Sequence, residues 1–535
     1  MESLASISRY DSPMDTKLVF QDAAGFATPL LAVFAVDIAT GKDADPLIAL
    51  LTTSDAVTNA AATVIASGEF KGCLGEQVLL HAPNGLKAER LLIVGLGKAK
   101  TLSVDEVRKG AGAALRYAKP RGIRQVTLAF PEDHALSDEH LENLPCTLLS
   151  RALLEGALLA EPDWDTYRSN RKDLSVEELT ILSPATEDST TREIQTGFEE
   201  GRIIGEAQNF TRTLVNEPGN VLTPTELGKR AAAMCAETGL KCEVHSTAKL
   251  EELGMGAFLA VAKGSAQPPA LIVMTYEPKL EKGKASAKDA SNPAPVLGLV
   301  GKGITFDTGG ISLKSAEGME KMKYDMAGAG AMIGAMRALA QLKPAVKVIG
   351  IVCSAENMPS GTAYKPGDIY TAMSGKTIEI MNTDAEGRMV LADGLHYAKT
   401  LGCTHLINAA TLTGACIVAL GMINAGVFSN DEATFEKFLQ SSRTSGEKFW
   451  RLPCTDDYKD VIKSQIADIM NTGGSRWGGA ISAAMFLKEF VEDTPWIHLD
   501  IAGCAWNEDV KPWHSKGPSG VAVRSIVEWV RGYSA

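Results

Sequence analysis

The sequence predicts an α/β protein of two domains, a smaller N-terminal α/β domain and a larger C-terminal α/β domain with a central mixed sheet flanked by helices. The length of 535 residues exceeds what one ordinary hydrophobic core holds. Short apolar runs typical of strands alternate with helical patterns along much of the chain. In the second half these runs are largely apolar, as expected of strands covered on both faces.

The N-terminal domain, residues 1–190, begins with a strand–helix–strand pattern. Ser103 and Glu106 have the spacing of a capping box, in which the two side chains satisfy the free amides at a helix start. A helix should therefore begin there and continue to about residue 118. Strands are predicted at 31–36, 91–94 and 125–130.

Two glycines, Gly95 and Gly97, follow the second of these strands. A dinucleotide-binding loop would need a third glycine, but Lys100 stands at its position. The pattern therefore favours a tight strand-to-helix turn over a nucleotide site.

A long helical pattern at 191–215 is predicted to connect the domains, and it ends at Pro218 and Gly219. The second domain, residues 216–535, resumes the alternation of strands and helices. Residues 279–295 are rich in Lys, Ala, Ser and Pro and are predicted to form an exposed loop. Strands are expected at 271–275, 296–300, 348–353, 378–381, 405–409 and 496–501.

Composition excludes several classes of function. A net charge of −12 and a pI near 5.3 argue against a nucleic-acid-binding surface. The nine cysteines are odd in number, scattered and without a CxxC pair, which is typical of a reducing compartment. Glu2 stands where a secretory signal would carry basic charge. Residues 406–428 lack charge, but polar residues and glycines interrupt them, so they favour a buried strand and loop over a membrane span. We therefore expect a cytoplasmic protein without membrane contact.

Two clusters of acids follow predicted strands, the first with Asp307 and Asp325, the second with Asp384 and Glu386. Ligand sites of open α/β sheets form beyond the carboxyl ends of strands, so the clusters could converge. Asp384 and Glu386 would face the same side if the turn between them is extended. Three Asp and one Glu can hold two divalent cations about 3.5–4 Å apart. Spacing alone supports a metal site and a solvated acidic loop equally.

The seven residues 382–388, Asn-Thr-Asp-Ala-Glu-Gly-Arg, resemble the signature of the leucine aminopeptidase family, the M17 metallopeptidases. The resemblance extends over about residues 205–525, whereas residues 1–190 share only general α/β character with the family. Further matching segments are 214–220, 301–307, 311–314, Asp325 and 410–414.

The resemblance implies five metal ligands for two divalent cations, which could be Zn, Mn, Co or Mg. Asp307 and Glu386 would bridge the two ions. Lys302 would bind as the neutral amine, so its pKa would have to fall far below the ordinary value. Oxygen ligands suit Mg or Mn, and the lysine nitrogen also suits Zn or Co. The full ligand set is Lys302, Asp307, Asp325, Asp384 and Glu386.

The resemblance also implies two catalytic residues with positively charged side chains, Lys314 and Arg388. Lys314 would donate to the scissile carbonyl oxygen as it becomes an oxyanion. Arg388, at the start of a helix expected at 389–399, would hold a bicarbonate as general base, because free amides and the helix dipole favour an anion there. Met322, Thr411 and Gly414 would line an apolar pocket, which favours Leu or other apolar residues such as Met at the substrate's N-terminus.

The implied function is a homohexameric exopeptidase that acts on peptides with a free N-terminus. One ion would bind the α-amine, a water activated by both ions would attack the carbonyl, and the bicarbonate would carry the proton to the leaving amine. His396 and His498 are interpreted as structural because neither has zinc-ligand spacing around it, and Asp500 receives no role.

Two alternatives stay open. A two-metal phosphoesterase would use the same carboxylates but would need no free amine. A non-catalytic nucleic-acid-binding or scaffold protein on this fold is disfavoured, because every matched ligand position is intact and the charge is acidic.

Overall fold

The computed structural model describes residues 14–40, 44–132, 144–184, 187–279, 294–473, 475 and 477–534. Most of the loop predicted at 279–295, and the N-terminal residues on which the expected absence of a secretory signal rests, lie outside these residues. The chain forms two compact units: Met1–Asn209 with Glu508–Lys516, and Phe210–Asn507 with Gly517–Ala535. We keep 1–190 and 216–535 as the proposed domains. The inclusion of Glu508–Lys516 in the first unit has no counterpart in the sequence pattern.

The N-terminal unit is built on a seven-stranded sheet in the order β1-β7-β6-β2-β5-β4, with β3 paired to β2. β4 and β3 pair antiparallel and the other neighbours are parallel. The strands predicted in this unit are confirmed as β2, β5 and β6. The strands are β1 (Asp15–Phe20), β2 (Leu31–Asp37), β3 (Ile48–Leu50), β4 (Gln77–His81), β5 (Arg90–Lys98), β6 (Gln125–Ala129) and β7 (Glu178–Ser183).

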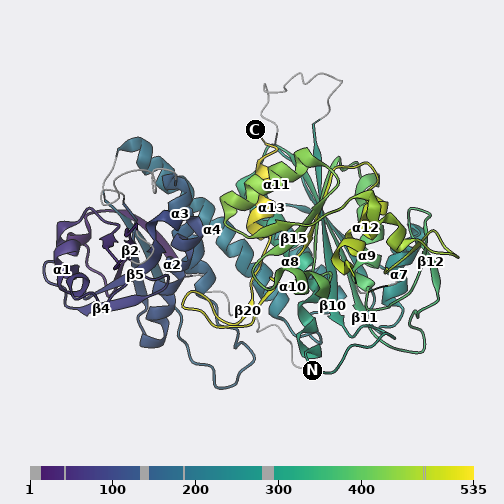
Figure 1. Cartoon of the computed structure of the whole chain (residues 1–535), viewed down its shortest axis with the longest axis horizontal. Helices are drawn as coiled ribbons and strands as arrows, with labels where there is room; N and C mark the ends of the chain where they lie inside the picture. The colour runs from purple at the N-terminus through teal and green to yellow at the C-terminus, as the bar shows by residue number, and fades with distance from the viewer. Residues whose placement is uncertain are drawn as a thin grey trace. The chain divides into compact units, whose positions relative to one another are not determined.

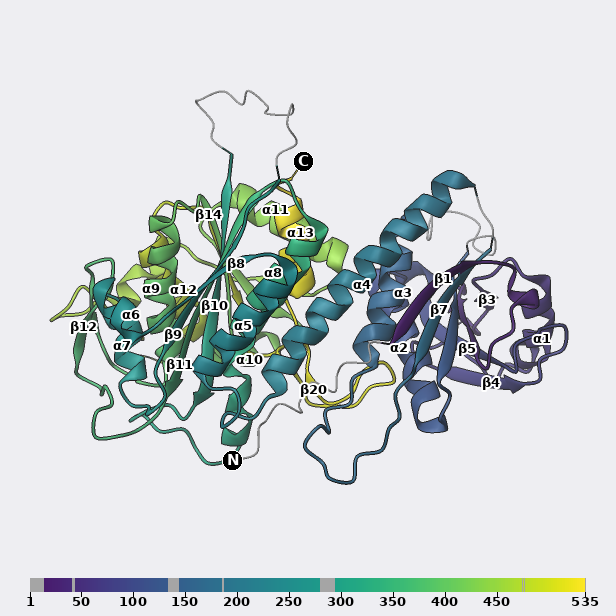
Figure 2. The same ribbon diagram turned by 180° about the vertical axis from the view of Figure 1, so that it is seen from behind.

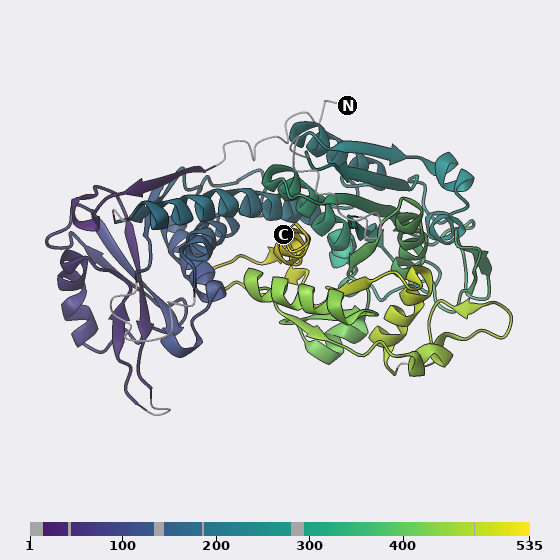
Figure 3. The same cartoon turned by 90° about the horizontal axis from the view of Figure 1, so that it is seen from above.

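The alternation of side chains along β2 explains why helices cover both faces of this sheet. Leu31 and Val33 pack with α1 (Asp55–Ala66), whereas Ala32 and Phe34 pack with α2 (Val104–Ala118) and α3 (Cys146–Ala160). Figure 3 shows α1 (purple) and the blue helices α2 and α3 on opposite faces. α2 begins where predicted: Ser103 accepts a hydrogen bond from the Asp105 amide (3.2 Å) and donates to Glu106.

The predicted glycine turn at Gly95 and Gly97 is wrong, because both residues lie within β5 and the strand continues to Lys98. A Cβ atom at Gly95 would lie 2.3 Å from the Cys73 carbonyl oxygen. Gly95 is therefore needed for the close approach of a neighbouring turn, and Gly97 for its positive φ of 86°.

The helix predicted at 191–215 is confirmed as α4 (Asp188–Asn216). The C-terminal unit is built on an eight-stranded sheet in the order β16-β15-β18-β14-β10-β11-β9-β8. β18, β14, β10 and β11 are parallel, and β15 and β9 pair antiparallel on either side of them, so the expected mixed sheet is confirmed. The strands are β8 (Lys241–His245), β9 (Ala270–Tyr276), β10 (Val296–Asp307), β11 (Lys347–Asn357), β14 (His405–Ala410), β15 (Ala425–Ser429), β16 (Phe449–Arg451) and β18 (Trp496–Asp500).

Helices flank this sheet on both faces (Figures 1 and 2). One face carries α5 (Pro224–Thr238), α8 (Ala327–Leu342), α11 (Glu432–Ser445) and α13 (Val523–Arg531). The other carries α7 (Gly256–Ala262), α9 (Glu386–Thr400) and α12 (Gly479–Val491). Shorter helices are α6 (Thr247–Glu252), α10 (Gly414–Leu420) and the 3-10 helices η1 (Ala23–Gly25), η2 (Ala99–Thr101), η3 (Lys119–Arg121), η4 (Met319–Met326) and η5 (Asp456–Ile462).

The strand predicted at 378–381 does not join the central sheet. It is β13 (Thr377–Glu379), and it pairs with β12 (Ile369–Thr371) and β17 (Ile469–Met470) in a separate three-stranded sheet. A two-stranded sheet of β19 (Trp506–Asn507) and β20 (Gly517–Pro518) brackets the 508–516 segment. The uncharged stretch 406–428 contains β14, α10 and β15, and no helix among the described residues is long and apolar enough to span a membrane.

Candidate metal centre and active site

The site begins where two parallel strands of the central sheet end side by side. Asp307 is the last residue of β10, Asn357 is the last residue of β11, and the two are register partners. The Asn357 amide donates to the Asp307 carboxylate (2.8 Å), and both residues are buried. Asn357 received no role from the sequence, because an asparagine at a strand end has many structural uses.

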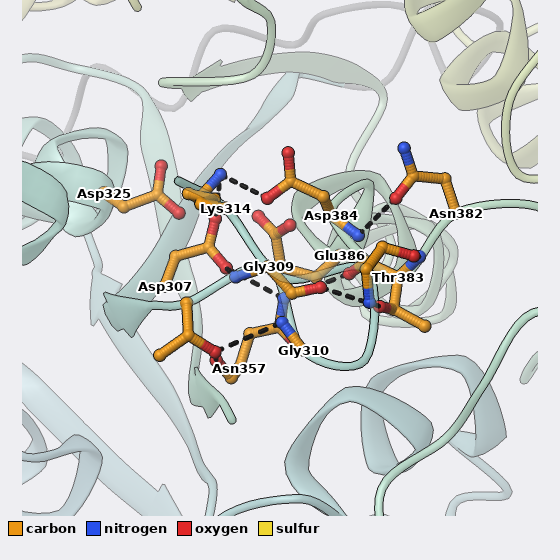
Figure 4. Close-up of polar contacts among 12 residues, drawn as sticks. Asp307, Gly309, Gly310, Lys314, Asp325, Asn357, Asn382, Thr383, Asp384 and Glu386 are labelled. Carbon is orange, nitrogen blue, oxygen red and sulfur yellow. Dashed lines mark hydrogen bonds and ion pairs between the residues drawn. The ribbon is translucent and has the colours of Figure 1, made fainter. Parts of the chain in front are cut away.

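The second acidic segment reaches the same place from the separate small sheet. Asp384 lies in the turn after β13, and Glu386 is the first residue of α9, so the expected extended turn is instead a helix start. The two acids nevertheless face Asp307 (Figure 4). One carboxylate oxygen from each of Asp307, Asp384 and Glu386 lies within 4.8 Å of the others.

Lys302 connects this group to Asp325, which lies in η4. The Lys302 ammonium is 2.8 Å from Asp325 Oδ1, 2.7 Å from Glu386 Oε1 and 2.9 Å from the Thr411 carbonyl oxygen. A Cβ atom at Gly387 would lie 2.6 Å from Lys302 Cδ, so glycine is required for this approach. All five predicted ligands are therefore close together.

Burial and neighbouring charges shift the pKa values of the acids and the lysine in this cluster. Burial raises the pKa of Asp307, and the neighbouring charge of Glu386 raises it further. Burial likewise raises the pKa of Asp325 well above its ordinary value, against the charge of Lys302. Burial lowers the pKa of Lys302, but the surrounding carboxylates outweigh it and the pKa lies above its ordinary value. Crowded buried acids of this kind need further positive charge.

Two buried carboxylate oxygens are available to bind a cation. Asp325 Oδ2 and Glu386 Oε2 have no hydrogen-bond partner among the described residues. Acidic oxygens with one lysine nitrogen form a donor set that suits divalent cations. The residues present thus fit a metal centre.

Lys314 extends into the same pocket and is partly exposed. Its ammonium lies 2.8 Å from Asp307 Oδ2 and also contacts Asp384 (Figure 4). Burial lowers the pKa of Lys314, but the charges of Asp307, Glu386 and the other acids outweigh it and the pKa is raised. Lys314 is a charged donor on the open side of the acid cluster.

Arg388 lies in the first turn of α9 and is 6% exposed. It donates from Nη1 to the Asn471 carbonyl (2.6 Å), and its Nε has no partner among the described residues. Burial lowers the pKa of Arg388 to about 10, although Glu386 and Asp500 oppose the shift. A buried guanidinium with a free donor beside a helix N-terminus suits a small anion.

All ten predicted site residues line one cavity of about 690 Å³. Met322, Thr411 and Gly414 line it with further apolar groups from Met319, Leu412, Ala415 and Ile417. Tyr324, Gly473, Gly479 and Ser482 also line the cavity and were not expected, because they come from segments without a site motif.

The structure assigns a local role to Asp500, which is fully buried at the end of β18. Its carboxylate accepts hydrogen bonds from the Thr413 hydroxyl (2.6 Å) and the Leu412 amide (3.2 Å). Asp500 therefore holds the loop that carries Thr411 and Gly414. His498 is fully buried, bonds Asn408 (2.9 Å), and fits the structural interpretation.

A buried cluster of carboxylates and a lysine at the carboxyl end of an α/β sheet is typical of metal-dependent enzymes. Two family models match the chain, "Cytosol aminopeptidase family, catalytic domain" over residues 209–527 and "Cytosol aminopeptidase family, N-terminal domain" over 33–171. The second match corrects the expectation that residues 1–190 share only general α/β character with the family. The chain belongs to the cytosol aminopeptidase family, and it is a metal-dependent M17 aminopeptidase.

Relatives cover nearly the whole chain. A protein of Acidobacterium capsulatum named "Probable cytosol aminopeptidase" is 56% identical over 97% of this chain and 100% of its own length. A protein of Aquifex aeolicus with the same name is 39% identical over 98% of this chain and 99% of its own length. A mutant of tomato leucine aminopeptidase shares the fold with a TM-score of 0.81 at 32% identity, covering 97% of this chain and 96% of its own. The bottromycin maturation enzyme BotP in complex with Mn has a TM-score of 0.79 at 33% identity. The match covers 95% of this chain and 100% of the BotP chain.

Proposed function

We propose that this aminopeptidase removes N-terminal Leu, or other apolar residues such as Met, from peptides, using two divalent cations and a bicarbonate. The observation that carries the proposal is the buried cluster of Lys302, Asp307, Asp325, Asp384 and Glu386, in which two carboxylate oxygens have no hydrogen-bond partner within the described part of the chain. These five residues would hold the cations, with Asp307 and Glu386 bridging. Bound there, divalent cations lower the pKa of water, polarise the scissile carbonyl and bind the substrate's α-amine.

Lys314 is proposed to stabilise the oxyanion. It is the cation on the open side of the cluster, and its raised pKa keeps it a charged donor. A fixed ammonium aimed at a developing negative charge stabilises the transition state more than the ground state.

Arg388 is proposed to hold the bicarbonate at the start of α9. Two observations support this assignment: Arg388 Nε has no hydrogen-bond partner among the residues that the structure describes, and α9 starts without a side-chain cap at Ala385. Held by Arg388, a bicarbonate would supply a general base for the proton transfer. The pocket residues Met322, Thr411 and Gly414 support an apolar side chain at the substrate's N-terminus.

We further propose a homohexamer in the cytoplasm, which the family resemblance and the scattered free cysteines support. A native mass of six times 56.8 kDa would support the hexamer, and a monomeric mass would contradict it.

Chelation and metal replacement test the two-metal proposal. Protein treated with a chelator should lose hydrolysis of leucyl p-nitroanilide and recover it when Zn, Mn, Co or Mg is supplied in turn. The same preparations should not hydrolyse an aryl phosphate, which separates the proposal from a two-metal phosphoesterase. Activity unaffected by complete removal of metal would overturn it.

A further inference from the structure

Thr383 stands inside the signature segment, between Asn382 and Asp384, and it is fully buried. It is not among the proposed ligands or catalytic groups. Its hydroxyl donates to the Gly309 carbonyl (2.7 Å) and accepts from the Ser312 amide (2.8 Å). Both partners belong to the loop that joins Asp307 to Lys314.

The pairing with Ser312 is reciprocal, because the Thr383 amide donates to the Ser312 hydroxyl (3.1 Å). The loop closes on itself where the Lys314 amide donates to the Thr308 carbonyl (2.9 Å). A Cβ atom at Gly309 would lie 2.9 Å from Asp384 Oδ1, so the loop and the Asp384 turn are in close contact. The backbone of Lys314 is thus placed by Thr383 and Ser312.

The backbone carbonyl of Thr383 connects to the metal side of the site. It accepts hydrogen bonds from the Asn357 amide group (3.0 Å) and the Tyr364 hydroxyl (2.7 Å). The same Asn357 nitrogen donates to Asp307 (2.8 Å). Figure 4 shows Thr383 beside Asp384, with Gly309 and Gly310 between it and Asp307.

We propose that Thr383 is a positioning residue whose hydroxyl holds the Lys314 loop against the metal-ligand turn. The inference rests on the proposed role of Lys314 as oxyanion donor. The hydroxyl holds the loop that carries Lys314, whereas the carbonyl, which any residue retains, acts on Asp307 through Asn357. The Gly309 amide of that loop also donates to Asp307 (2.8 Å), but Asp307 should keep its Asn357 bond and its place at the end of β10 when the hydroxyl is removed. Removal of the hydroxyl should therefore lower the turnover rate strongly and change the affinity for metal little.

Thr383→Val and Thr383→Ser separate the hydroxyl from the shape of the side chain. Valine leaves the Gly309 carbonyl and the Ser312 amide without partners, and a small misplacement of a catalytic group is costly in rate. We expect kcat for leucyl p-nitroanilide to fall about 10–100-fold at saturating Mn²⁺, with KM and the calorimetric Mn²⁺ dissociation constant each within about 3-fold. Serine should keep kcat within about 3-fold of the wild type.

Thr211→Val is the matched control, because Thr211 is a buried threonine of the same unit whose hydroxyl donates to the Gly330 carbonyl (2.8 Å) away from the cavity. It should leave kcat unchanged. Thr383→Ala also removes the hydroxyl and provides a second test if Thr383→Val does not fold, and kcat should fall with the same unchanged Mn²⁺ affinity. Wild-type kcat in folded Thr383→Val, or in Thr383→Ala where the valine variant does not fold, would overturn the inference. So would a loss that higher Mn²⁺ restores.

A double-mutant cycle with Lys314→Met shows whether Thr383 acts through Lys314. If it does, Thr383→Val should cost no more than about 3-fold in the Lys314→Met background. If the loss of kcat in the double mutant equals the combined losses of the two single mutants, the inference about Thr383 is overturned, and the proposed role of Lys314 is not. Near-normal turnover in Lys314→Met by itself would instead overturn the proposed role of Lys314, so the two failures are distinguishable.

Discussion

Glu386 is the least exposed acid of the cluster. It is 1% exposed, one oxygen lies 2.7 Å from the Lys302 ammonium, and the other has no partner among the described residues. It also begins α9, two residues before Arg388. The position of one carboxylate thus depends on a helix start, a lysine from β10 and the dense packing at Gly387.

Glu386→Ala should abolish peptidase activity, because it removes the proposed bridging ligand and leaves Lys302 with one acid fewer. We expect kcat/KM for leucyl p-nitroanilide to fall at least about 1,000-fold. The exposed Glu320 of η4, which does not line the cavity, is the control: Glu320→Ala should retain activity. Near-normal turnover in Glu386→Ala would contradict the ligand assignment.

His498 predicts a pH dependence of stability. Burial, together with the charge of Arg388, lowers the pKa of His498 to about 3. The unfolded chain binds a proton at this residue near pH 6.5, whereas the folded chain does not, so stability falls as the pH drops below 6.5. The His498 contribution should amount to roughly 2 kcal/mol by pH 5.

Urea unfolding at pH 7 and pH 5 checks this contribution. His498→Gln should show a smaller loss of unfolding free energy between the two pH values than the wild type. An equal loss in both proteins would show that His498 binds a proton in the folded chain.

At the scale of elements, the loop of residues 411–414 joins the metal side of the cavity to the apolar side. Thr411 donates to Asp325 (2.8 Å) and accepts from Lys302 (2.9 Å), and Asp500 holds the loop at its other end. The loop leads into α10, which Thr413 caps by accepting from the Cys416 amide (3.0 Å). The shape of the pocket therefore depends on three neighbouring elements, β14, α10 and β18.

Asp500→Ala should release this loop, because the Thr413 hydroxyl and the Leu412 amide lose their acceptor. We expect KM for leucyl p-nitroanilide to rise about 10-fold, with Mn²⁺ affinity unchanged. Asp500→Asn retains an acceptor oxygen and should have a smaller effect. An unchanged KM in Asp500→Ala would show that the loop holds its shape without this anchor.

The strands that the sequence predicted are those with long apolar runs, such as β10, β11 and β14. The edge strand β8 was missed, because its exposed positions carry polar residues and leave no apolar run. β13 was found as a strand but not assigned to its small sheet, because a buried apolar run does not specify its partner. Local pattern thus identifies an element more readily than its neighbours.

At the scale of the whole molecule, Glu508–Lys516 belongs to the N-terminal unit although it lies near the end of the chain. Trp513 packs on the core of that unit, and a Cβ atom at Gly75 would lie 3.1 Å from its ring. The Lys109 ammonium lies 5.6 Å from the ring centroid. The N-terminal unit is therefore completed by residues that lie within the segment matched by the catalytic-domain model.

Trp513→Ala should destabilise the N-terminal unit by about 3–5 kcal/mol, because a large partly buried side chain is removed from its core. Hydrogen exchange in residues 77–118 should increase, while activity at low temperature stays close to the wild type. Trp450→Ala, at a tryptophan 63% exposed in the other unit, is the control. Unchanged exchange in Trp513→Ala would show that the segment does not contribute to this core.

By itself the sequence determined the α/β class, the long connecting helix and the residues that meet in the cavity, because periodicity and short contiguous motifs carry that information. Only the tertiary structure decided which residues hold those groups in place. Asn357 bonds Asp307 across 50 positions, and Thr413 bonds Asp500 across 87. Such hydrogen bonds exist only when folding brings distant segments together, and a single buried Asn, Thr or Asp leaves no local pattern from which its partner can be found.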